Sequence, residues 1–103
     1  MIVRAWRGRA PLSKPEAYPT HFHDNVLPEL HGVPGFLGAS LLRLDHPGHI
    51  EFLVLTRWVS IDAIKAFAGA DVAMAVVEPG AVAALADYDR TVSHYEVVEE
   101  ATV

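Results

Sequence analysis

The chain has 103 residues, of which 51% are hydrophobic and 20% are charged. This length fits one domain over residues 1–103, and the apolar fraction excludes a disordered chain. The formal net charge of −5 does not favour a nucleic-acid-binding surface. Cysteine is absent, which excludes disulfides, thiolate metal sites and thiol nucleophiles. No apolar run reaches the ~20 residues of a membrane span and no leader peptide is visible, so we expect a cytoplasmic protein without membrane or nucleic-acid partners.

The first third of the chain predicts a strand followed by a helical region. Residues 2–10 mix apolar residues with arginines and form the strand. Residues 13–30 form the helical region, in which an apolar residue recurs every fourth position at Tyr18, Phe22, Val26 and Leu30. The opposite side of this helix carries His21, Asp24 and His31. We expect Pro19 either to kink the helix or to delay its start to Thr20, and Gly32 to help end it.

The middle of the chain predicts an antiparallel hairpin. Its strands are residues 36–44 and 50–58, and residues 45–49 have the composition of a turn. Leu53, Val54 and Leu55 are a continuous apolar run, which is typical of a strand covered on both faces.

The last third predicts a second helical region and a final strand. Ser60 is a candidate N-cap, Gly69 is placed to end the helix, and the inward stripe is Ala63, Ile64 and Phe67. A further turn is expected after Asp71, through Val72 and Val76. Pro79 and Gly80 interrupt it, and residues 81–86 form one or two more helical turns. Residues 90–98 read as the last strand and residues 99–103 as a tail.

The order of elements is strand, helix, strand, strand, helical region, strand. It predicts an α+β, ferredoxin-like split βαβ fold, with a four-stranded antiparallel sheet and helices on one face. Right-handed crossovers place the first and third strands in the middle.

The sheet face away from the helices is expected to be apolar. Both registers of the first and third strands carry apolar residues, with Val3 and Ala5 on one register of the first strand and Ile2 and Trp6 on the other. An uncovered apolar face invites association. We therefore expect a two-fold homodimer packed sheet to sheet, in which Trp6 faces the partner; the alternative is a monomer with a half-hydrated sheet.

Three segments resemble the antibiotic biosynthesis monooxygenase family: residues 33–38 (VPGFLG), residues 58–67 and residues 91–97 (TVSHYEV). The resemblance implies a dimeric α+β barrel with a pocket between sheet and helices in each subunit. Members of this family include cofactor-free oxygenases of polyketide quinones, haem-degrading enzymes and proteins without an assigned activity.

The resemblance also implies a check on haem degradation. Haem-degrading members carry an asparagine on the first strand, a tryptophan in the second helical region and an iron-ligating histidine. The corresponding positions here are Arg7, Phe67 and Val77. Phenylalanine has no N–H donor and valine cannot ligate iron, so we expect neither haem degradation nor a bound cofactor.

His94 and Arg7 are the candidate catalytic residues. Imidazole titrates near neutrality, so His94 is suited to act as a base; the alternative is a strand histidine bonded to a neighbour or buried in the dimer interface. If the Arg7 face of the strand meets the helices, the guanidinium is suited to hold an enolate or carboxylate. The alternative is a salt bridge with Glu51 or Glu96.

Four further residues are candidates for contact with a small aromatic substrate: Trp58, Phe67, Tyr88 and His21. Trp58 and Phe67 are either pocket walls or core. His46 and His49 flank a turn beside Asp45 and are the best candidates for a metal site, but their spacing is a weak signal and we expect no metal.

The sequence supports three hypotheses of function. The first is a cofactor-independent monooxygenase that oxidises a small aromatic, polyketide or quinol-like substrate with O₂. The second is a non-oxidative cyclase, isomerase or small-molecule-binding protein on the same barrel. The third is a protein whose pocket is filled by its own side chains.

Overall fold

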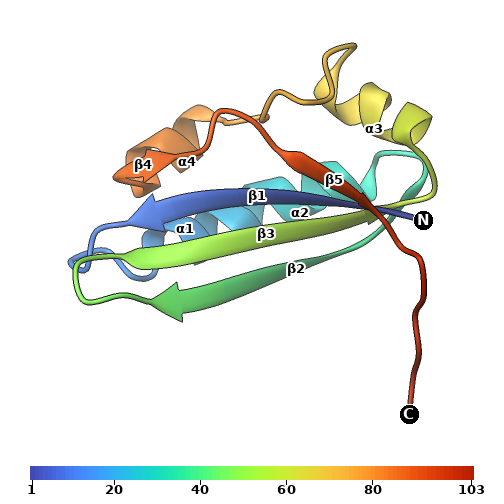
Figure 1. Ribbon diagram of the computed structural model, residues 1–103. Coiled ribbons are helices and arrows are strands. Elements are labelled where there is room, and N and C mark those ends of the chain that lie inside the picture. Colours follow the sequence, from blue (N-terminus) through green and yellow to red (C-terminus); the bar gives the residue numbers. More distant parts are fainter.

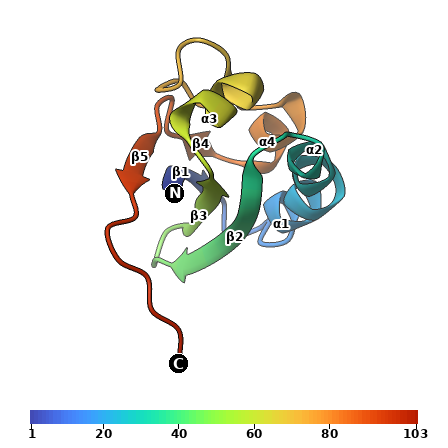
Figure 2. The same cartoon turned by 90° about the vertical axis from the view of Figure 1, so that its right-hand side faces the viewer.

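The computed structural model describes all 103 residues and contains one curved sheet. Its strands are β1 (Ile2–Ala10), β2 (Phe36–Asp45), β3 (Ile50–Trp58), β4 (Asp87–Tyr88) and β5 (Ser93–Glu96). All pairings are antiparallel, in the order β2-β3-β1, with β4 and β5 both paired to the outer edge of β1. The helices pack on one face of this sheet (Figure 1, Figure 2). The predicted α+β fold, with the first and third strands in the middle, is confirmed.

The first helical region is continuous from Ala17 to His31. It comprises α1 (Ala17–His21), a π-helical turn η1 (Phe22–Val26) and α2 (Leu27–His31). The helix neither kinks at Pro19 nor starts at Thr20, because Pro19 falls in its first turn, where no backbone N–H is needed. The π turn stands just before Pro28, which has no N–H to donate to the helical ladder. There, the Leu27 N–H donates to the Phe22 carbonyl five residues earlier.

The short helix α3 (Ile61–Ala68) begins and ends where the sequence predicts. The Ser60 hydroxyl accepts a hydrogen bond from the Ala63 N–H at 3.2 Å, and Gly69 ends the helix with φ +84°. Ile64 is the residue of α3 that is fully buried.

The segment between α3 and α4 corrects two expectations. Residues 74–78 are extended instead of helical, and Pro79 begins α4 (Pro79–Ala84) instead of interrupting a helix. The expected final strand is split, because residues 90–92 leave β1 and pair with residues 73–75: Met74 bridges Thr91, and the Val92 N–H donates to the Ala73 carbonyl at 2.9 Å. Tertiary pairing therefore overrides the local helical pattern here.

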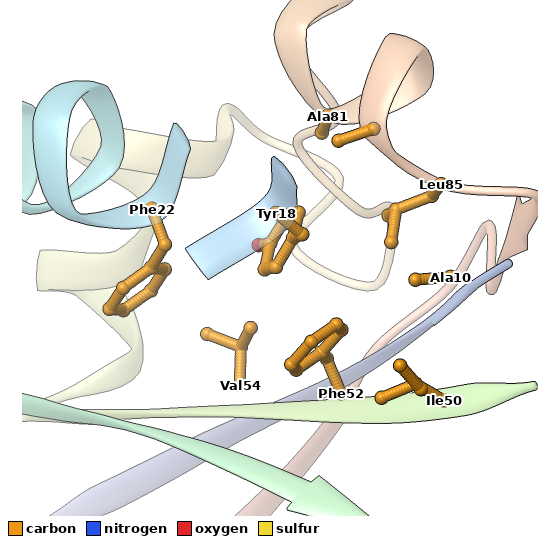
Figure 3. Packing of buried hydrophobic residues seen from close by; sticks show 9 residues of the cluster. Ala10, Tyr18, Phe22, Ile50, Phe52, Val54, Ala81 and Leu85 are labelled. Carbon is orange, nitrogen blue, oxygen red and sulfur yellow. The ribbon is translucent and has the colours of Figure 1, made fainter. Parts of the chain in front are cut away.

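The hydrophobic core forms two separate clusters. The larger one lies between the helices α1 and α4 and the inward face of β3, and includes Tyr18, Phe22, Phe52 and Val54 (Figure 3). The smaller one joins Leu30, Trp58 and Ile64. The apolar stripe predicted for the first helix is confirmed, because Tyr18, Phe22 and Leu30 are all buried.

The opposite face of the sheet has no helix over it. Cross-strand pairs place a set of apolar side chains there: Val3, Leu42, Leu53, Leu55 and Tyr95. Leu42 and Tyr95 are 45% and 58% exposed, so the single chain leaves this set accessible. We call it the open face. The C-terminal residues run away from the body of the molecule beyond β5 (Figure 1).

Candidate functional site

A cavity separates the two core clusters, between the inward face of the sheet and the helices. The enclosed space itself is about 50 Å³, below the roughly 300–1,000 Å³ of usual small-molecule sites, and it continues into an open mouth. Its floor comes from β1 and β3, with Arg4, Trp6, Val54 and Thr56. Its walls come from the first helical region, α3, α4 and the segments before α4 and β5, with Tyr18, His21, Val26, Leu30, Phe67, Val76, Glu78, Ala81 and Val92.

Arg4 is a buried cation on the cavity floor, only 5% exposed. Its Nη1 donates to the Val72 carbonyl at 2.6 Å and to His94 Nε2 at 3.0 Å, and its Nη2 donates to the Met74 carbonyl at 2.8 Å. Burial lowers the pKa of Arg4. The guanidinium therefore ties the 72–74 segment to the sheet while facing the cavity.

His21 presents a ring nitrogen without a partner. Its Nε2 is buried and makes no hydrogen bond, whereas Asn25 Nδ2 lies 3.1 Å from its Nδ1. An amide nitrogen has no free lone pair, so Asn25 donates and Nδ1 accepts; in the neutral ring the proton is then on Nε2. Gly80 leaves room for this ring, since a Cβ there would lie 2.6 Å from Nδ1. His21 therefore contributes to the wall of the cavity, while its Nε2 stays buried and unpaired.

Tyr18 and Glu78 add a hydroxyl and a carboxylate to the same walls. Burial, and then the nearby Glu78 carboxylate, raise the pKa of Tyr18, so its hydroxyl stays protonated. Partial desolvation, and then the charge of Glu78, raise the pKa of Glu29. The cavity therefore has one neutral donor, the Tyr18 hydroxyl, and one carboxylate, Glu78.

The structure brings two of the predicted substrate-contact residues to the cavity and leaves two outside it. Phe67 and His21 line it. His21 does so although its side of the helix was expected to face away, because α4 covers that side. Trp58 is fully buried beneath, with its ring 5.8 Å from that of Phe67 and its Nε1 bonded to Thr56 Oγ1 at 2.8 Å. Tyr88 packs against Trp6, with ring centroids 6.3 Å apart, outside the cavity.

The two predicted catalytic residues do not face the cavity directly. His94 lies behind Arg4, and its Nε2 lone pair accepts the Arg4 hydrogen bond. Burial, and then the charge of Arg4, lower the pKa of His94 and keep it neutral. Arg7 projects from the open face, 3.4 Å from Glu51, in the salt bridge that was the alternative.

The register of β1 is the reason for this difference. Even-numbered residues of β1 pair with the buried even-numbered residues of β3, so Arg4 and Trp6 face the helices and Arg7 faces away. This is opposite to the expected placement of Trp6. Sequence reasoning missed Arg4, Tyr18 and Glu78 as site residues. The sequence does contain a sign that Arg4 faces the helices. Gly8 and Ala10 lie on the same side of β1 as Arg4, and their small size allows α4 to pack closely there.

His46 and His49 do converge, but not as a metal site. Their rings stack with centroids 4.4 Å apart, and His46 Nε2 lies 3.1 Å from Glu51 Oε1. No group of three or more potential metal-ligating side chains gathers anywhere in the structure.

Comparison with known protein families decides the identity of the fold. The model of the family described as "Antibiotic biosynthesis monooxygenase" matches residues 1–79. The chain belongs to this family. No curated protein matches the chain. The family assignment confirms the resemblance seen in the sequence and is consistent with a monooxygenase-type domain.

Two solved structures of the antibiotic biosynthesis monooxygenase fold are similar to this chain. One, from Bacillus cereus, is described as a candidate antibiotic biosynthesis monooxygenase; it has a TM-score of 0.67 and 16% identity, with 99% of this chain and 97% of that chain covered. The other is an arginine-to-serine mutant of MhuD with two manganese protoporphyrin IX molecules bound per active site. Its TM-score is 0.69 and its identity 21%, with both chains fully covered. At these identities the likeness shows the fold alone. None of the helices has the length and apolar character required to cross a membrane.

Proposed function

We propose that this chain is a cofactor-independent monooxygenase that oxidises a small aromatic or quinol-like molecule with O₂. The observation that carries the proposal is the cavity between sheet and helices, in which apolar and aromatic walls surround a few polar groups. Such a site excludes water and places donors and a base around one face of a flat ligand.

The chemistry needs a base, donors for the developing anion and a dry chamber. Glu78 is the group that accepts a proton from the acidic C–H or O–H of the substrate, and the Tyr18 hydroxyl donates to the resulting oxyanion. The anion then transfers an electron to O₂, the two radicals combine in a C–O bond, and loss of water leaves a carbonyl. In sum, a CH₂ group and O₂ give C=O and H₂O.

The catalytic roles suggested by the sequence are therefore reassigned. His94 has no free lone pair at Nε2, and Arg7 lies on the other side of the sheet. The roles pass to Glu78 and Tyr18 because these groups line the cavity.

A homodimer completes the proposal. Proteins of this family commonly dimerise, and the open face exposes apolar side chains across three strands. We propose that two copies pack their open faces together in a dimeric α+β barrel, which leaves each cavity accessible on the helix side. A cytoplasmic location and the absence of a cofactor stay predictions.

Haem degradation is not part of the proposal, although MhuD binds a manganese porphyrin. Val77 packs its aliphatic side chain against the larger core cluster and offers no ligand to iron. Phe67 lines the cavity without a polar atom.

Oxygen uptake by the purified full-length chain tests the function. A panel of anthrones and hydroquinones, without added metal or flavin, is expected to give turnover above the uncatalysed rate. Tyr18→Phe and Glu78→Gln are each expected to lower kcat about 100-fold, since positioned donors and bases contribute about 10²–10⁴. The matched controls are Tyr95→Phe and Glu99→Gln, whose side chains are exposed outside the cavity.

Two other results would overturn the monooxygenase. Folded protein without turnover on the panel, but with a ligand-induced rise in Tm that is independent of oxygen, would favour the non-oxidative alternative. Turnover that is unaffected by both cavity variants would place the chemistry elsewhere.

A further inference from the structure

Arg4 is the one arginine of β1 that has no carboxylate partner. Arg7 pairs with Glu51, and Arg9 pairs with Asp87 and Asp89. Both are more exposed than Arg4, which is 5% exposed. A buried charge without a counter-charge is unfavourable unless something compensates it. The protein itself provides only neutral acceptors to Arg4.

The hydrogen bonds of Arg4 leave part of its guanidinium free. Two backbone carbonyls and His94 occupy three of its five N–H groups. Neither Nε–H nor the second N–H of Nη2 has a partner in the protein. Arg4 Nε is also not among the buried unpaired atoms, and Arg4 is one of the residues that line the cavity. Two adjacent N–H groups of a guanidinium match the two oxygens of a carboxylate.

We infer that the cavity binds an aromatic ligand that carries an anionic oxygen group, and that Arg4 on the cavity floor is the residue that binds this group. The inference rests on the proposed function for its site and adds the chemical class of the substrate. It requires the anion to be a permanent part of the ligand, separate from the position that is oxidised.

The charges around the cavity support a ligand with two different ends. Arg4 lies beside β5 and the 72–74 segment, and its ionisable neighbour there, His94, is neutral. The carboxylate of the cavity, Glu78, precedes α4 and lies near Tyr18 and Glu29, on the helix side. A ligand that binds Arg4 through its anionic group keeps that group on the sheet side, whereas the Glu78 carboxylate belongs to the helix side.

Binding of matched naphthalene probes to the full-length protein tests this inference without requiring turnover. The probes are 2-naphthoate and its neutral isostere 2-naphthamide, titrated calorimetrically at pH 8 in low salt. 2-Naphthol, titrated below and above its own pKa, distinguishes a phenolate from a carboxylate as the anionic group. The carboxylate is expected to bind at least tenfold more tightly than the amide, because hydrogen bonds to charged partners are the stronger ones.

Variants assign the preference to Arg4. Arg4→Gln is expected to remove the tenfold preference for the carboxylate, and Arg4→Lys to retain part of it with a single-point donor. The control is Arg43→Gln, which removes the same charge from an exposed residue paired with Asp45, outside the cavity. If Arg4→Gln does not fold, the inference is still tested by two measurements. These are the preference for 2-naphthoate over 2-naphthamide in the unchanged protein and in the Arg4→Lys variant.

The outcomes separate this inference from the proposed function. Equal binding of naphthoate and naphthamide, or a preference unchanged in Arg4→Gln, overturns the anion inference and leaves the monooxygenase standing. A carboxylate preference without turnover on any acidic aromatic keeps the inference and counts against oxidation. If none of the three probes binds, the anion inference is overturned, and oxygen uptake with the one-ring hydroquinones still decides the proposed function.

Discussion

At the scale of single residues, the site depends on which way each polar side chain of β1 points. Arg4 and Arg7 are three residues apart, so they lie on opposite faces of the strand: one is buried on the cavity floor and the other is exposed beside Glu51. The same residue type thus provides a ligand-facing cation in one case and a surface ion pair in the other. Burial, rather than residue type, makes the first of them a candidate for function.

The carboxyl pair of Glu29 and Glu78 gives a pH-dependent prediction at this scale. The pKa of Glu29 is raised, so the folded protein holds this proton more tightly than the unfolded chain. The stability that protonated Glu29 contributes is therefore present below the pKa that Glu29 has in the unfolded chain. It is lost as pH rises through the pKa that Glu29 has in the folded protein. Glu29→Gln removes the repulsion and is expected to stabilise the protein by about 0.5 kcal/mol at pH 7, a typical value for an exposed charge pair, with little effect near pH 3.5.

Urea denaturation at the two pH values measures this effect. Glu99→Gln in the exposed tail is the control and is expected to change stability at neither pH. If Glu29→Gln raised the free energy of unfolding equally at both pH values, the account in which Glu78 raises the pKa of Glu29 would be contradicted.

At the scale of elements, the junction between the first helical region and β2 is held by a close approach to α3. Gly35 has φ +87°, and a Cβ there would lie 2.6 Å from Ala63 Cβ and 2.9 Å from Val59 Cγ2. Its carbonyl also accepts a hydrogen bond from the Val59 N–H at 3.0 Å. Only glycine fits both the backbone conformation and the contact, so this position fixes how α3 sits against the start of β2.

A graded set of glycine-to-alanine variants tests this account. Gly35→Ala combines backbone strain with a clash and is expected to destabilise the fold by about 2–3 kcal/mol. Gly69→Ala has the strain alone, at φ +84° in open space, and is expected to cost about 1 kcal/mol. Gly48→Ala has neither and serves as the control. Thermal unfolding that ranks the three variants in any other order would contradict the close approach.

At the scale of the whole molecule, the sheet separates two functions. Its inward face forms the core clusters and the cavity, whereas the open face carries Val3, Leu53 and Leu55 with no element over them. The proposed second copy would cover the apolar surface on that side. The proposed site and the proposed interface therefore lie on opposite sides of one layer.

Sedimentation in dilute buffer measures the proposed dimer. We expect a species of twice the chain mass of 11.2 kDa. Leu55→Glu on the open face, whose cross-strand neighbours Ala5 and Ser40 carry no charge, is expected to give a monomer, because a buried unpaired carboxylate in the interface is strongly unfavourable. Val82→Glu on α4, where the valine is 48% exposed, is the control and is expected to remain dimeric. A single 11.2 kDa species for the unchanged protein would remove the barrel from the proposal.

The sequence by itself determined the order of elements, the fold class and the family. Periodic apolar residues, the Ser60 cap and Gly69 are local signals, and they act through short-range physics that a sequence displays. The residues of the candidate site could not be predicted in this way. Tertiary structure alone decided that Arg4 faces the cavity and that α4 covers His21. It also decided that residues 73–75 pair with residues 90–92 instead of forming a helix. These outcomes depend on strand register and long-range pairing, which no local pattern encodes.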